Sequence, residues 1–82
     1  MKTLTYRTII EKDGKAYHGY VPALPGCHTR GKTIEETKNN LKEAMENWIA
    51  VSADLGWNIP EDDLIEVLQT VNVPAEKVRA YA

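Results

Sequence analysis

Residues 21–36 read VPALPGCHTRGKTIEE, and this segment indicates a rigid corner that leads into a helix. Pro22 and Pro25 each fix one backbone angle and remove one amide donor. Gly26 and Gly31 allow backbone angles that residues with a Cβ resist. We therefore expect a strand to end at the first proline, a short strand to follow the corner, and a helix to begin at the end of the segment.

The start of that helix carries a capping box. Thr33 is followed three residues later by Glu36, and in such a pair the hydroxyl and the carboxylate bond amides at the helix end. The helix is expected over residues 34–55, with Gly56 as a left-handed stop. One stripe along it carries the residues that should face a sheet: Ile34, Leu41, Ala44, Met45, Trp48, Ser52 and Leu55.

The segments on either side of Asp13 and Gly14 alternate in the manner of strands. Residues 4–10 and 16–21 are rich in β-formers, and the Asp-Gly pair between them is a turn signal. Together they predict a hairpin, which residues 27–31 extend with a third strand.

A fourth strand is expected after the helix. Residues 65–73 place four apolar residues on one side: Ile65, Val67, Val71 and Val73. Pro74 ends the run. The sequence therefore predicts an α+β fold in the order β-β-β-α-β, with an antiparallel-rich sheet and one long helix packed on one face. We expect a single domain over residues 1–82, in which residues 74–82 form a tail.

Charge and hydropathy narrow the class of partner. The 82 residues carry a net charge of −2, which argues against a general nucleic-acid coat. Residues 1–42 hold eight Lys or Arg against four Asp or Glu (+4), whereas residues 43–82 hold two against eight (−6). The acidic half favours a basic partner. Neither a membrane-spanning run nor a signal peptide is recognisable, so we expect a cytoplasmic protein.

The residues do not suggest catalysis. Cys27 and His28 are an adjacent thiol and imidazole, but neighbours on a strand point to opposite faces. His18 and His28 with Asp13 lack the local clustering of a zinc site. We therefore predict no catalytic residue, no metal and no cofactor, and a chain that acts by binding.

The corner and the helix start together resemble the HicB-like antitoxin family, over about residues 3–73. The residues that carry the resemblance are Pro22, Leu24, Pro25, Gly26 and Cys27 in the corner, then Gly31, Thr33, Glu35 and Glu36. The resemblance implies a partial ribonuclease H-like fold without catalytic function. It also implies that the domain binds and neutralises a small basic toxin, HicA, which cleaves mRNA.

Two further expectations concern assembly and DNA. The family resemblance and the thin core of so short a chain both favour a homodimer or a higher homo-oligomer. Many members of the family add a C-terminal DNA-binding module. Only eight residues follow Pro74 here, which is too short for such a module. We therefore expect no direct DNA binding.

The acidic run after the helix is the candidate surface for a basic partner. It comprises Glu61, Asp62 and Asp63, with Glu66 close by. A solvated helix start is the plainer interpretation of the same residues. An alternative function is a self-associating scaffold, or a small-ligand-binding domain, that has no toxin partner. RNA binding is a further alternative that rests on fold analogy alone.

Overall fold

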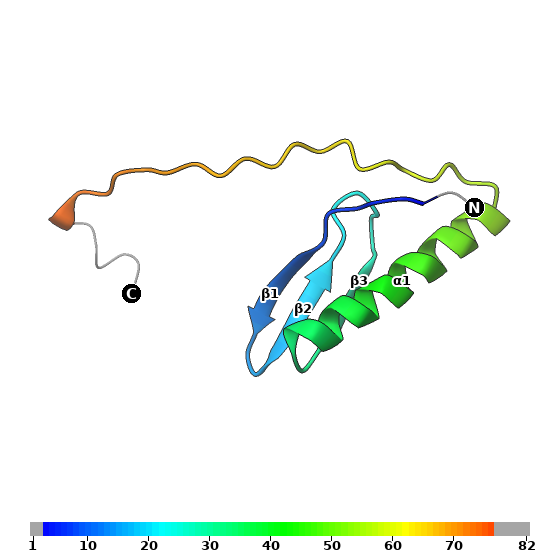
Figure 1. Cartoon of the computed structure of the whole chain (residues 1–82), viewed down its shortest axis with the longest axis horizontal. Coiled ribbons are helices and arrows are strands. Elements are labelled where there is room, and N and C mark those ends of the chain that lie inside the picture. The colour runs from blue at the N-terminus through cyan, green and yellow to red at the C-terminus, as the bar shows by residue number, and fades with distance from the viewer. Residues whose placement is uncertain (1–2, 77–82) are drawn as a thin grey trace.

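The computed structural model describes residues 3–76, and its folded part has two layers (Figure 1). Three antiparallel strands form a sheet in the order β1-β2-β3: β1 spans Ile9–Asp13, β2 spans Ala16–Tyr20 and β3 spans His28–Gly31. A long helix, α1, spans Ile34–Asp54 and packs against one face of this sheet. The predicted α+β class, with an antiparallel sheet and one helix on one face, is confirmed.

The predicted hairpin forms, but its first strand is shorter than expected. Asp13 lies opposite Ala16, so Gly14 and Lys15 make a two-residue loop of the kind that suits the twist of paired strands. Residues 3–8 are extended and lie outside the β1 ladder. The alternation at 4–10 was therefore only partly a strand signal, because part of that segment bonds the chain that follows the helix.

The corner between β2 and β3 is held by its own backbone. The amide of Val21 donates to the carbonyl of Cys27, the amide of Leu24 to that of Val21, and the amide of Cys27 to that of Leu24, each at 3.0 Å. Gly26 adopts a φ of +80°, which L side chains resist. Leu24 is fully buried, so the corner is packed as well as hydrogen-bonded.

Gly26, before β3, and Gly31, the last residue of β3, serve different purposes. Gly26 provides a backbone angle, as the sequence predicts. Gly31 does not, because its φ is not positive, and the expectation for that residue is wrong. A Cβ on Gly31 would lie 2.5 Å from the hydroxyl of Thr37 and 2.8 Å from its backbone nitrogen. Gly31 is therefore required because the helix start approaches β3 too closely for any side chain.

The helix ends are capped much as predicted. The Glu36 amide donates to the Thr33 hydroxyl at 3.0 Å, and the Glu36 carboxylate accepts from the Lys32 amide at 3.4 Å. The Glu36 carboxylate thus bonds the amide of Lys32, the residue before the cap, instead of the amide of Thr33 itself. At the other end Gly56, with a φ of +73°, lets the Trp57 amide donate to a carbonyl of the last turn.

The core is small and lies between α1, the corner and the sheet. Its buried hydrophobic residues are Val21, Leu24, Cys27 and Leu41, and the half-buried residues packed around them are Tyr6, Ile10, Ala44, Met45 and Trp48. The predicted contribution of Leu41, Met45 and Trp48 is confirmed. The ends of the predicted stripe are not in the core, since Ile34 and Leu55 are 53% and 57% exposed.

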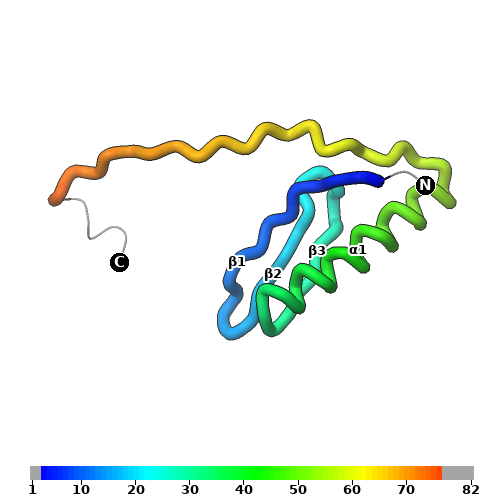
Figure 2. The backbone as a smooth tube through the Cα atoms, viewed as in Figure 1, coloured from blue at the N-terminus to red at the C-terminus, as the bar shows by residue number. Residues whose placement is uncertain are grey.

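The predicted fourth strand is not part of the sheet. Residues 65–73, which we call the arm, run extended but pair with no strand among the described residues, and Figure 2 shows the arm leaving the domain on the β1 side. Residues 65–73 do have the alternating pattern of a strand. A strand joins a sheet only by bonding to the free edge of another strand, and this segment does not fold back onto the edge of its own sheet. Ala75 and Glu76 begin a helical turn, and the rest of the predicted tail lies outside the described residues.

Candidate partner-binding surface

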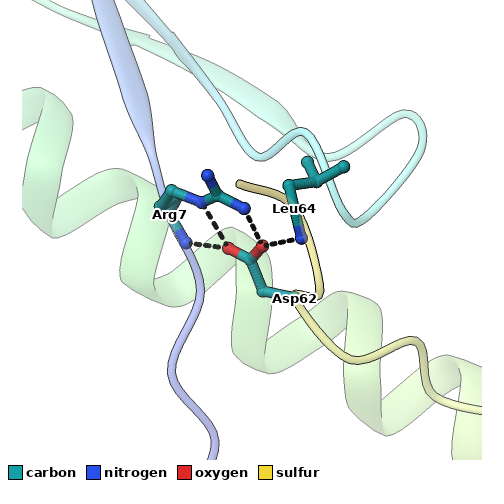
Figure 3. Close-up of polar contacts among 3 residues, drawn as sticks. All are labelled: Arg7, Asp62 and Leu64. Carbon is teal, nitrogen blue, oxygen red and sulfur yellow. Dashed lines mark hydrogen bonds and ion pairs between the residues drawn. The ribbon is translucent and has the colours of Figure 1, made fainter. Parts of the chain in front are cut away.

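The segment after the helix is fixed to the N-terminal segment at Asp62. Its carboxylate accepts from the backbone amide of Arg7 at 2.6 Å, from Nη2 of the same arginine at 2.6 Å, and from its Nε at 3.3 Å (Figure 3). The Leu64 amide also donates to it, at 3.2 Å. The Tyr6 hydroxyl adds a bond to the Pro60 carbonyl. These contacts set where the arm begins.

This arrangement changes the role expected for Asp62. The guanidinium of Arg7, followed by the amide of the same residue, holds the pKa of Asp62 far below the usual value. The Asp62 side chain is only 7% exposed. The sequence had suggested that Asp62 contacts a partner. In the structure its carboxylate is instead bonded to Arg7 and anchors the segment after the helix.

The other acidic residues of the predicted surface remain accessible. Glu61, Asp63 and Glu66 are all exposed, and they flank the anchored Asp62. Both Glu66 and Asp63 lie close enough to Arg7 to raise the pKa of that guanidinium further, after the direct bond from Asp62. Three free carboxylates thus gather where the arm leaves the domain.

The sheet has a second, uncovered face. Gly19 and Gly31 face the helix, since a Cβ on either would meet Thr37. Residues directly opposite each other in an antiparallel ladder share a face, and neighbours along a strand alternate. The register therefore places eight residues on the open face: Ile9, Glu11, Asp13, Ala16, His18, Tyr20, His28 and Arg30.

Three rings cluster on this open face. The His18 ring stacks on that of Tyr20, with centroids 5.9 Å apart and planes 25° apart. The rings of His18 and His28 are 5.6 Å apart and tilted. A shallow hollow lies beside them, bordered by these rings and by Pro25 at the corner. Such a surface can stack against a planar group and offer hydrogen bonds from imidazole and phenol.

Charged residues frame the rings. Arg30 on β3 pairs with Asp13 on β1 at 3.2 Å, and Nδ1 of His18 lies 3.8 Å from the Glu11 carboxylate. All of these groups are partly or largely exposed, so the pairs contribute little to stability. They give the open face a mixed charge that a partner can match.

The sequence missed this face, although a signal for it exists. The Asp13-Gly14 turn fixes the hairpin register, and that register places Glu11 opposite His18. Combined with alternation along the strands, it would have grouped Glu11 with His18 and Tyr20 on one face, whereas His28 joins them through the pairing of β2 with β3. The sequence interpretation considered the two histidines as metal ligands, and His28 also as a partner of the Cys27 thiol, but it did not group them with Tyr20. Among residues 3–76 no group of three or more His, Cys, Asp or Glu side chains could hold a metal ion.

The residues of the proline motif have a structural role in the fold. Leu24 and Cys27 are buried, and burial raises the pKa of the Cys27 thiol. Pro22 and Pro25 are exposed, and the Pro25 carbonyl accepts from the indole nitrogen of Trp48 at 3.0 Å. The corner is therefore tied to the helix, and it positions the hollow beside the rings.

In the part of the chain described, no helix is long and apolar enough to cross a membrane.

Comparisons with known proteins cover both layers of the fold. The profile of a family described as UPF0150-like matches residues 1–60. A UPF0150 protein of Thermoplasma acidophilum is 42% identical over 65 residues, covering 78% of this chain and 94% of that protein. One from Archaeoglobus fulgidus is 37% identical over 71 residues, covering 85% and 96%. Among solved structures, the N-terminal domain of the Burkholderia pseudomallei antitoxin HicB has a TM-score of 0.56 at 27% identity, covering 89% of this chain and 76% of that one.

Proposed function

Because the chain belongs to the UPF0150-like family and its fold is similar to that of the N-terminal domain of a HicB antitoxin, we propose that it is an antitoxin-like domain that binds a small basic toxin. The likeness to the antitoxin domain is the observation that carries this proposal. The toxin we expect is of the HicA kind, an mRNA-cleaving protein. Such a target places the domain in the cytoplasm, and it requires no DNA-binding module.

The proposed contact surface begins at the three free carboxylates. Glu61 and Asp63 are exposed and flank the anchored Asp62, which holds their negative charge at a fixed place on the domain, and Glu66 adds a third exposed carboxylate at the start of the arm. Charge complementarity of this kind raises the rate of encounter more than it raises the final affinity. The open sheet face, with its rings and mixed charges, supplies further contact area.

The proposed action is occlusion of the toxin and requires no chemistry from this domain. The likeness to an antitoxin supports a binding function in place of an enzymatic one. The ribonuclease H reaction needs carboxylates that converge on two metal ions. In this domain Glu11 and Asp13 lie beside His18 and Arg30 on the open face, and the other acidic residues of the described chain lie on α1 or in the segment that follows it.

The experiment uses the product of the reading frame adjacent to this gene, which the proposal expects to be short, basic and histidine-bearing. Association with the purified chain is followed by stopped-flow fluorescence of the tryptophans. The test variant combines Glu61→Lys, Asp63→Lys and Glu66→Lys. The control variant makes the same change of charge on the exposed side of α1, with Glu43→Lys, Glu46→Lys and Asp54→Lys.

We expect the test variant to associate about 10- to 100-fold more slowly at low salt, since steering by local charge has that size. The difference should fade towards 1 M salt, where the screening length falls to about 3 Å. The association rate of the control variant should fall much less. Equal losses in both variants would show that only total charge matters, and a test variant as fast as the parent would refute the proposed surface.

A second candidate function is binding of a small ligand, either alone or within a self-associated scaffold. The observation that favours it is the hollow beside His18, Tyr20 and His28 on the open face. An NMR screen with aromatic fragments tests it. Shifts centred on these three residues, in a chain whose gene has no toxin-like neighbour, would favour this function over the first.

A further inference from the structure

The arm, residues 65–73, is an exposed, largely apolar extended segment that pairs with no strand among residues 3–76. Ile65, Leu68 and Val71 are 87%, 93% and 75% exposed, and Val67 is 66% exposed. No hydrogen bond joins the arm to another part of the chain within residues 3–76. Extended backbone with unpaired amides and carbonyls is a ready template for pairing with another strand.

The side chains of the arm suit a half-buried strand. Ile65, Val67, Val71 and Val73 lie on one side, and that side is interrupted only by Gln69. The other side is more polar, with Glu66, Thr70 and Asn72 beside one leucine, Leu68. This alternation indicates a strand with one face towards a core and one towards solvent. In the single chain both sides of the arm are exposed, so its apolar side faces no core among residues 3–76.

The domain offers a matching vacancy at the edge of β1. Within the described part of the chain, the sheet order leaves the outer side of β1 unpaired. The helix packs mainly on β3 and β2, so the layer above β1 is incomplete and Ile10 is only half-buried. A hollow between the N-terminal segment and the helix is lined by Leu4, Ile49 and Ala50, with Glu46 beside them. An added strand with an apolar face would extend the sheet and fill the layer.

The arm runs away from the β1 edge of its own domain. Asp62 binds Arg7, just before β1, and also the Leu64 amide, and beyond this point the arm continues past the sheet (Figures 2 and 3). The described chain reaches 55 Å in its longest direction against 29 and 19 Å in the others, because the arm projects from the domain. At about 3.3 Å per residue, its nine residues span about 30 Å, which is longer than the five residues of β1 require.

We propose that the arm of one chain adds as a strand to the β1 edge of a second copy, and that the second copy returns its own arm in the same way. A reciprocal exchange closes with twofold symmetry, so each contact is made twice. It covers the exposed apolar side of both arms and both free β1 edges at once. This inference goes beyond the proposed function, because it concerns self-association and holds whether or not a toxin is bound.

The first test is the mass of the full chain by sedimentation equilibrium from low to high micromolar concentration. One chain has a mass of 9.2 kDa, so the exchanged dimer has twice that, 18.4 kDa. The test variant carries Val67→Lys and Val71→Lys on the apolar side. The matched control carries Thr70→Lys and Asn72→Lys on the polar side, so the added charge is the same.

The arm is detached from its own domain, so neither variant should change the fold, and circular dichroism checks this. The parent and the control should dimerise, and the test variant should dimerise at least about 100-fold more weakly, because two valines per arm lose their burial. A parent that stays at the mass of one chain would overturn the proposal. So would a dimer that both variants weaken equally, or that neither weakens.

The second test identifies the edge that receives the arm. A nitroxide label is placed at Thr70→Cys, where it reports on the arm, while the native Cys27 is buried and shielded from the reagent. Labelled copies are mixed with nitrogen-15 copies that carry no label. We expect the β1 amides of the nitrogen-15 copies to lose intensity. Losses that are larger at β3 than at β1, or no losses in the mixed dimer, would overturn the assignment, since β3 lies two strand spacings of about 4.8 Å further away.

Discussion

Replacing Gly31 by alanine tests the closest contact in the fold. The new Cβ would lie 2.5 Å from the hydroxyl of Thr37, 2.8 Å from its nitrogen and 3.0 Å from its Cα. Two of these three atoms belong to the backbone, and Thr37 lies in the first turn of α1, whose cap is formed by Thr33. The clash therefore cannot be relieved by rotating one side chain. The helix start must move away from β3.

The magnitude follows from the kind of atoms that collide. Overpacking a core usually costs about 1–3 kcal/mol, and a collision with backbone belongs at the upper end, so we expect a loss of about 3 kcal/mol for Gly31→Ala. In a domain of this size each kcal/mol shifts the melting temperature by roughly 4–8 °C, which gives a fall of roughly 12–24 °C. Gly19→Ala should cost less, because its Cβ would meet only the side chains of Leu41 and Thr37.

The assay is urea unfolding followed by tryptophan fluorescence, with thermal melting by circular dichroism as a second measure. Thr37→Ala in the Gly31→Ala background supplies the control, since it removes the hydroxyl but leaves the backbone atoms in place. We expect that double variant to recover only part of the loss. A cost below about 1 kcal/mol for Gly31→Ala, or full recovery in the double variant, would refute the explanation by backbone approach.

The remaining predictions concern the core and the Asp62 anchor. Leu41→Ala should lower the free energy of unfolding by about 2–5 kcal/mol in urea, because the Leu41 side chain is fully buried. Trp48→Phe should lower it by only about 1 kcal/mol, mainly through loss of the hydrogen bond from the indole to the corner. A larger loss for the tryptophan variant than for the leucine variant would contradict the half-buried position of Trp48. Asp62 has a pKa held below its usual value by Arg7, so it contributes stability above the pKa of the unfolded chain, about 3.9, and that contribution is lost as the pH falls towards the folded value. The urea midpoint of the parent should therefore fall more steeply below about pH 4 than that of Asp62→Asn, and parallel curves would contradict the anchor.

Much of the fold could be predicted because its signals are local. The Asp13-Gly14 turn, the proline corner, the Thr33 cap and the Gly56 stop each involve residues within a few positions of one another, and the structure confirms all four. The resemblance to HicB-like antitoxins, which rests on the same corner and cap, is confirmed by the family match and by the fold. The surface formed by Glu61, Asp63 and Glu66 stays a prediction.

The sequence by itself determined the strand and helix patterns, the turns and the caps, because backbone geometry and short-range hydrogen bonds depend on neighbouring residues. Only the tertiary structure decided which groups meet across long separations. Asp62 became an anchor because Arg7, 55 residues earlier, lies against it. Gly31 proved to be needed for close packing with Thr37 instead of for an unusual backbone angle. The strand pattern of residues 65–73 was visible in the sequence, but a strand joins a sheet only where an edge is within reach, and the single chain directs this one away from its own.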